Sequence, residues 1–188
     1  LTPYVVYHYR MTAQDSAGYE GPPSAVVSAS TTLPPEAGFP AVTLGASNGS
    51  VTMANLDADP ALEVIGAGEE IYALNLDGSE LVDGDHDPAT NGALTSTGRP
   101  GYWNAPAVAD VDNDGSPDVA AVSWTGAAWL WSGTGQVKPG FPRNVNPLNL
   151  AAPNPLGSVV LGDADGDGTR EIYFQVGANI WAFHADGT

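Results

Sequence analysis

The chain has 188 residues, of which 22 are acidic and 5 basic, giving a formal net charge of −17. This balance argues against DNA or RNA as a partner, because phosphate binding needs clustered Lys and Arg, and it disfavours an anionic membrane surface. No run approaches the roughly 20 apolar residues of a membrane-spanning helix. The absence of cysteine excludes disulfides, thiolate metal sites and cysteine nucleophiles. Most acids have no base to pair with, so a metal cation is the expected counter-charge.

Short runs rich in Val, Ile, Trp and Tyr predict strands along the whole chain. The 23 glycines and 16 prolines punctuate these runs, and helical periodicity never persists beyond about two turns. The sequence therefore predicts an all-β fold. Because the chain opens at Leu1 without an initiator Met or a signal peptide, we expect a piece of a longer protein.

Residues 1–31 predict a β-hairpin that differs in character from the rest of the chain. Apolar residues alternate along 4–12, a turn is expected at 15–18, and a second strand follows at 25–31. The stretch resembles the last two strands of a fibronectin type III domain, through Tyr7, Tyr9, Asp15, Gly18 and Val27. The resemblance implies that Tyr7 supports the corner entering its strand. Residues 32–36, which include two prolines, predict a short stiff linker.

Residues 37–188 contain a repeat of about 50 residues, the length typical of a propeller blade. Acidic loops begin at 55, 110 and 163, and each is followed by apolar strands and by a Gly-containing turn. The tripeptide Gly-Phe-Pro recurs at 38–40 and 140–142. Short strands in such a repeat predict a partial β-propeller of about three four-stranded blades. Because propellers typically have four to eight blades, we expect that the remaining blades lie beyond Thr188 or have been lost.

The three acidic loops share the pattern Asp/Asn-x-Asp-x-Asp-x-x-x-Asp/Glu over nine residues. Calcium takes six to eight oxygen ligands, and closely spaced carboxylates on a tight loop supply them. We predict two to three structural calcium ions, held by side chains at positions 1, 3, 5 and 9 and by the backbone carbonyl of position 7. These candidate ligands are Asn55, Asp57, Asp59, Ala61 and Glu63 in the first loop, Asp110, Asp112, Asp114, Ser116 and Asp118 in the second, and Asp163, Asp165, Asp167, Thr169 and Glu171 in the third.

Two other interpretations of these loops are less consistent with the sequence. Asp and Gly are common in plain turns, but turn chemistry does not require an acid at position 9 three times over. An EF-hand begins with the same spacing, yet it needs a Glu at position 12 and a helix on each side. Position 12 holds Gly66, Ala121 and Phe174, and the flanking segments predict strands, so an EF-hand is excluded.

The loops and their flanking strands resemble FG-GAP/VCBS repeats, the calcium-binding blades of integrin α-chain propellers and of many large secreted bacterial proteins. The resemblance covers about residues 36–188, and it lacks the literal Phe-Gly…Gly-Ala-Pro motif, so the bacterial secreted branch fits better. It implies calcium ligands at positions 1, 3, 5, 7 and 9 of the second and third loops. The first loop departs with Asn55 at position 1 and Pro60 at position 6, where the others have glycine. We expect weaker binding there, because proline cannot adopt a positive φ.

Three further features carry less specific signals. Residues 83–91 place acids at alternate positions, which we interpret as a solvated loop, with a metal site as the alternative. His8, His86 and His184 lie in unrelated segments, so no catalytic arrangement can be argued from them. Aromatic residues at repeated strand positions predict packing between blades, with a sugar-binding platform as the alternative; they are Tyr102, Trp103, Trp124, Trp129, Trp131 and Trp181.

These features together predict a non-catalytic, calcium-binding fragment of a secreted or cell-surface modular protein. We expect adhesion or ligand binding, with an extracellular protein or glycan as partner, and neither nucleic-acid binding nor membrane insertion. One alternative is a non-catalytic part or propeller scaffold of a secreted hydrolase or polysaccharide lyase. Two others are an enzyme, namely a polysaccharide lyase with catalytic groups on the propeller face, and an accessory region of a secreted protease. Against a lyase, the acids are assigned to calcium, and the bases of residues 37–188 outside the loops that could neutralise a uronate are only Arg99, Lys138 and Arg143.

Overall fold

The computed structural model describes residues 6–30, 38, 39, 41, 43, 49–57, 59–82, 84, 86, 92–145 and 157–188. Across these ranges the chain forms strands, turns and bends but no helix, and so none long and apolar enough to cross a membrane. The described strands pair into four antiparallel sheets, which confirms the all-β prediction. The chain separates into two compact units, Leu1–Glu36 and Ala37–Thr188.

The first unit contains a β-hairpin formed by β1 (Val6–Tyr9) and β2 (Val27–Ser30), paired in antiparallel register. The turn lies where it was predicted, because Asp15 Oδ1 accepts the backbone N–H groups of Ala17 and Tyr19 at 2.8 and 3.0 Å. Within the described residues β1 ends at Tyr9, before the predicted end at 12, and β2 begins at Val27, after the predicted start at 25. The hairpin is confirmed, whereas its origin in a fibronectin type III domain stays a prediction.

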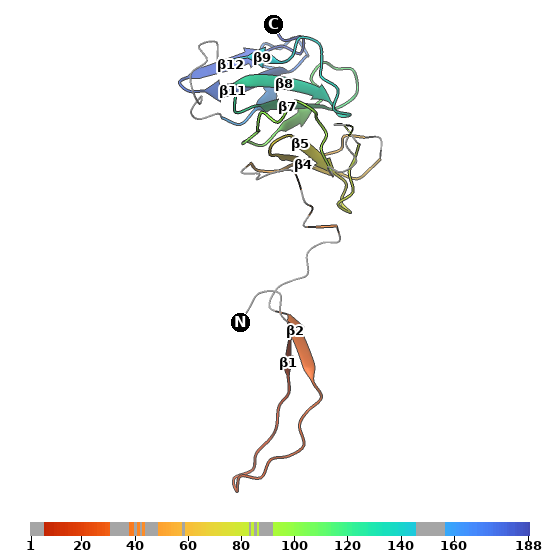
Figure 1. The fold of residues 1–188 in the computed structure, drawn as a ribbon, viewed down its shortest axis with the longest axis vertical. Helices are drawn as coiled ribbons and strands as arrows, with labels where there is room; N and C mark the ends of the chain where they lie inside the picture. The colour runs from red at the N-terminus through yellow and green to blue at the C-terminus, as the bar shows by residue number, and fades with distance from the viewer. Residues whose placement is uncertain are drawn as a thin grey trace. The chain divides into compact units, whose positions relative to one another are not determined.

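The second unit contains three antiparallel sheets, called here the first, second and third blades (Figure 1). In each blade consecutive strands pair as a meander, and a fourth strand is present among the described residues of the second blade. The strands are β3 (Thr52–Ala54), β4 (Glu63–Ala67) and β5 (Ile71–Leu74) in the first blade; β6 (Ala107–Ala109), β7 (Asp118–Val122), β8 (Ala127–Ser132) and β9 (Arg143–Asn144) in the second; and β10 (Val160–Gly162), β11 (Glu171–Val176) and β12 (Asn179–Phe183) in the third.

The second blade has an apolar core on each of its two faces. On one face Val119 and Trp131 pack with Ile65 and Ile71 of the first blade. On the other face its alternate residues pack with Ile172 and Phe174 of the third blade. Apolar residues at successive positions of β7 and β8 contribute to the two cores in turn, because successive strand residues point to opposite sides of the sheet. The first strands also adjoin, since β6 contacts both β3 and β10, as the innermost strands of a propeller do.

Each acidic loop joins the first and second strands of its blade. The first loop (55–63) links β3 to β4, the second (110–118) links β6 to β7, and the third (163–171) links β10 to β11. Position 9 of each loop is therefore the first residue of a buried strand, namely Glu63, Asp118 and Glu171. The sheet thus fixes one carboxylate at the base of every loop.

Candidate metal centre

The structure brings acidic side chains of each loop together. One ligand atom from each member of a cluster lies within 4.8 Å of all the others. The clusters are Asp57, Asp59 and Glu63 in the first loop, Asp110, Asp112 and Asp118 in the second, and Asp163, Asp165, Asp167 and Glu171 in the third. Like charges at this distance repel one another unless a cation or protons intervene. Asp114 is not a member of the second cluster. The ligand roles of Asp114, of Asn55 and of the backbone carbonyls of Ala61, Ser116 and Thr169 stay predictions.

The three loops are built by the same two backbone contacts. In each loop one oxygen of the position 9 carboxylate accepts the position 2 N–H group, at 2.5, 3.0 and 2.9 Å in chain order. The position 5 carboxylate accepts the position 7 N–H group, at 2.6, 2.8 and 2.8 Å. These bonds curl the loop over its base, and the position 9 carboxylate keeps one oxygen directed away from the backbone.

That second oxygen is buried and has no hydrogen-bond partner in the first and third loops. Glu63 is 0% exposed and Glu171 is 4% exposed, and Oε1 of each accepts no hydrogen bond from the described residues. A buried carboxylate oxygen without a partner is strongly unfavourable. Calcium, which binds carboxylate oxygens, would satisfy both. The donor set therefore fits the metal that the sequence predicted.

The first loop differs from the others at two linked positions. In the second loop Asp110 Oδ2 accepts the N–H group of Gly115 at 3.0 Å, and Asp163 and Gly168 repeat this contact at 3.0 Å in the third. Both glycines have positive φ, 89° and 93°. Pro60 of the first loop lacks an N–H group and cannot adopt this φ. Asn55 replaces the aspartate and donates its side-chain N–H to the backbone carbonyl of Asp59.

The second loop differs because a lysine enters its cluster. Lys138, which follows β8, has a side chain only 13% exposed, and its Nζ lies 2.8 Å from Asp112 Oδ2 and 2.9 Å from Asp114 Oδ2. The same Nζ lies 2.9 Å from Asp118 Oδ1, the counterpart of the unpartnered oxygens, in an ion pair that lacks hydrogen-bond alignment. Sequence reasoning missed this contact, because Lys138 lies 20 residues beyond the loop.

The pKa values of the second loop reflect that ammonium group. Burial lowers the pKa of Lys138, but its hydrogen bonds to the carboxylates outweigh burial and raise the pKa above its ordinary value. The hydrogen bond from Lys138 is the main reason why the pKa of Asp114 is lowered. Burial raises the pKa of Asp118, and Lys138 opposes that rise.

The third loop has a neighbour that the sequence did not reveal. His184, the residue after β12, approaches Glu171 Oε1 with Nδ1 at 3.7 Å and is close to Asp165 and Asp167. Calcium prefers oxygen ligands, so His184 is not expected among its ligands. The second and third loops also touch, because the backbone N–H of Arg170 donates to the carbonyl of Val111 at 3.1 Å.

The aromatic residues lie mainly in the core. Tyr102 and Trp131 are fully buried and meet edge to face, with ring centroids 5.8 Å apart. Trp103 is 44% exposed and stacks on Trp124 at 3.8 Å. Packing between blades therefore accounts for the buried pair. Most of the predicted loop at 83–91 lies outside the described residues.

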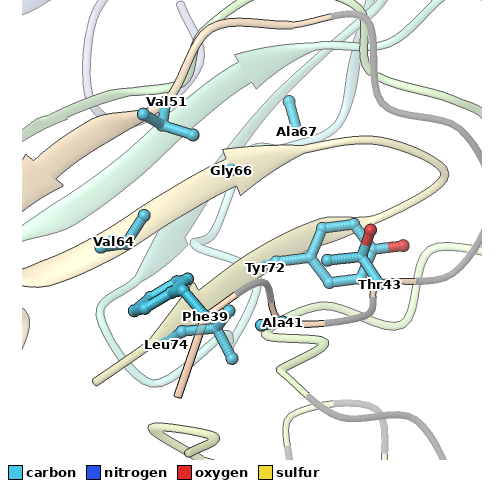
Figure 2. Close-up of a pocket in the computed structure, with 9 residues that line it drawn as sticks. All are labelled: Phe39, Ala41, Thr43, Val51, Val64, Gly66, Ala67, Tyr72 and Leu74. Carbon is cyan, nitrogen blue, oxygen red and sulfur yellow. The ribbon is translucent and has the colours of Figure 1, made fainter. Parts of the chain in front are cut away.

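An apolar pocket lies on the face of the first blade opposite its contact with the second (Figure 2). Val64, Tyr72 and Leu74 of β4 and β5 line it together with Phe39 from the preceding segment. The described residues that line it are all uncharged.

Glu70 is a buried carboxylate that sequence reasoning did not single out. It is 3% exposed and accepts hydrogen bonds from the hydroxyl groups of Thr95 and Thr97 and from the backbone N–H groups of Thr97 and Arg99, at 2.6–2.9 Å. These partners follow 25–29 residues later, so local sequence gave no signal. Unlike Glu63, Glu70 is satisfied by the chain itself and needs no cation.

Replacing Glu70 by Gln should destabilise the second unit equally with and without calcium. Both oxygens of Glu70 now accept hydrogen bonds, and in the variant the NH₂ group of Gln would replace one of them and face donors. This mismatch should lower the free energy of unfolding by about 1–3 kcal/mol. Thermal unfolding in EDTA and in calcium measures both effects. A loss of stability in only one of the two conditions would contradict the assignment of Glu70 as satisfied by protein donors.

Residues 110–174 match the family model described as FG-GAP-like repeat. The matched segment begins at position 1 of the second loop and includes the whole third loop. It confirms the FG-GAP part of the resemblance drawn from the sequence, while the VCBS and fibronectin type III parts stay predictions. No curated protein matches the chain.

Proposed function

We propose that Ala37–Thr188 is a non-catalytic propeller region whose acidic loops bind structural calcium. The observation that carries this proposal is the pair of buried carboxylate oxygens, Glu63 Oε1 and Glu171 Oε1, which accept no hydrogen bond from the described residues and lie beside other carboxylates of their loops. The cation would hold the start of β4 or β11 to the curled loop above it. Its role would be to offset carboxylate repulsion rather than to take part in a reaction.

The ligand chemistry favours calcium over magnesium. Calcium accepts six to eight oxygen ligands in flexible geometry, whereas magnesium requires a near-ideal octahedron and retains several waters. Asp163, Asp165 and Asp167 offer carboxylates at alternate positions of one short loop, together with Glu171 from the strand. Such a local set of carboxylates and backbone oxygens suits the longer ligand distances of calcium, about 2.3–2.6 Å.

At the level of the whole protein we propose adhesion or ligand binding in a secreted or cell-surface protein. The match to FG-GAP-like repeats supports an extracellular setting, since such repeats occur in extracellular proteins. The acidic loops are assigned to calcium, which leaves a scaffold role as the simplest function for this segment. An extracellular protein or glycan is the proposed partner.

The test is to count the ions bound by protein stripped with EDTA. Native mass spectrometry and isothermal titration calorimetry should both give two or three calcium ions per chain, with magnesium at equal concentration leaving the calcium count unchanged. Glu171→Gln should bind one ion fewer, and Glu70→Gln should bind the wild-type number. Absence of calcium binding would overturn the proposal.

A further inference from the structure

In each loop one oxygen of the position 9 carboxylate accepts a backbone N–H group, and the other points away from the backbone. In the first and third loops the second oxygen accepts no hydrogen bond from the described residues, and in the third loop His184 Nδ1 lies 3.7 Å from it. In the second loop the corresponding oxygen, Asp118 Oδ1, lies 2.9 Å from Lys138 Nζ. The three repeats thus provide an internal comparison. Among the described residues, the position 9 carboxylate of the second loop has a lysine ammonium at 2.9 Å, whereas that of the third loop has the imidazole of His184 at 3.7 Å. Arg170, inside the third loop, donates instead from its guanidinium group to the backbone carbonyl of Asp110.

The ammonium group of Lys138 lies among the loop carboxylates in the way a bound metal ion would. An ammonium has three N–H donors and no acceptor. Its nitrogen lies 2.8–2.9 Å from one oxygen of each of three carboxylates, at positions 3, 5 and 9. Three of the four loop acids are therefore neutralised from within the chain, and Asp110 binds backbone N–H groups instead.

The first blade has an uncharged residue where the second has this lysine. The N–H group of Lys138 donates to the carbonyl of Leu130, and in the first blade Leu81 donates in the same way to Ala73. The turns before these two residues also correspond. The N–H group of Ser132 donates to the carbonyl of Gln136 in the second blade, and that of Asn75 donates to the carbonyl of Ser79 in the first. Leu81 packs against the apolar core and cannot neutralise Glu63.

We propose that Lys138 serves as the built-in cation of the second loop, so that this loop takes no calcium while the first and third loops do. The inference rests on the proposed calcium role of those two loops. An ammonium and a calcium ion cannot share one carboxylate cluster, because their charges repel at close range. Calcium could enter only by driving a largely buried side chain into solvent.

The experiment counts bound calcium in EDTA-stripped wild-type protein and in Lys138→Met, by native mass spectrometry and calorimetry. Methionine keeps an unbranched apolar side chain and removes the charge. Wild type should bind two ions, and Lys138→Met should bind three. Arg99→Met is the matched control, because it removes one positive charge from a side chain that is 55% exposed and pairs with Glu69, which belongs to none of the acidic loops, and it should bind two. Lys138→Arg keeps the charge and should also bind two.

The outcomes separate this inference from the proposed function. Three ions in wild type, or two in both wild type and Lys138→Met, would overturn the role of Lys138 and leave the calcium proposal standing. No ions in wild type and one in Lys138→Met would overturn the calcium role of the first and third loops but support the role of Lys138. No ions in either protein would overturn both.

A second measurement needs no variant, because Lys138 is the only lysine of the chain. An amine-acylating reagent should modify Lys138 slowly compared with the α-amino group, both in EDTA and in saturating calcium. Mass spectrometry of the digested protein gives both rates. Rapid modification of Lys138 in calcium would show that the ion displaces the ammonium, and would overturn the inference even if Lys138→Met fails to fold.

Discussion

Removal of calcium should destabilise the second unit by about 5 kcal/mol relative to saturating calcium. A ligand that binds only the folded state at 100 times its dissociation constant adds about 2.7 kcal/mol per site, and the first and third loops supply two such sites. For a unit of this size the melting temperature should fall by about 10–20 °C. Calorimetry of the same preparation in EDTA and in calcium gives the difference.

The control for this effect is added salt. Magnesium or sodium chloride at matched ionic strength screens the loop carboxylates without providing the same ligand geometry, so each should recover only a small part of the lost stability. An equal rise in melting temperature with sodium would show that screening of the net charge, rather than bound calcium, stabilises the blades. An unchanged melting temperature in calcium would show that the loops are plain turns.

Glu63→Gln should change stability in opposite directions with and without calcium. Without calcium the variant should unfold at a higher temperature than wild type. It removes a buried charge whose Oε1 accepts no hydrogen bond from the described residues, and it relieves the repulsion of that charge from Asp57 and Asp59. With saturating calcium the variant should lose about 2.7 kcal/mol, the contribution of one site at 100 times its dissociation constant. Thermal unfolding in the two conditions measures this reversal of sign.

Glu70→Gln is the matched control, since it makes the same substitution at an equally buried position of the same blade. Glu70 already has protein donors around both oxygens, so its variant should be less stable in both conditions. If Glu63→Gln also destabilises the protein in EDTA, Glu63 has a partner that is not calcium, and the central argument for the first loop fails.

The sequence was sufficient to predict what is local in the chain. The hairpin turn at Asp15, the three acidic loops and the strand that begins at each position 9 acid depend on neighbouring residues and on a repeat, and all three are observed. The consequence of Pro60 was also foreseeable. Both of its counterparts, Gly115 and Gly168, adopt the positive φ that proline cannot reach.

Contacts between distant segments could not be predicted in the same way. Lys138 reaches the second loop because β8 ends beside the start of β7, where Ser132 pairs with Asp118, so its effect depends on strand pairing rather than on a motif. His184 reaches the third loop through the analogous pairing of β11 with β12. Glu70 likewise meets its donors only after the chain returns past the edge of β5.

Diffraction from crystals grown in calcium, recorded at a long wavelength where calcium scatters anomalously, would locate bound calcium directly. We expect one anomalous peak beside Glu63 Oε1 and another beside Glu171 Oε1, each about 2.3–2.6 Å from the carboxylate oxygens, and the Lys138 ammonium in the second loop. Anomalous peaks missing from both the first and the third loop would contradict this expectation.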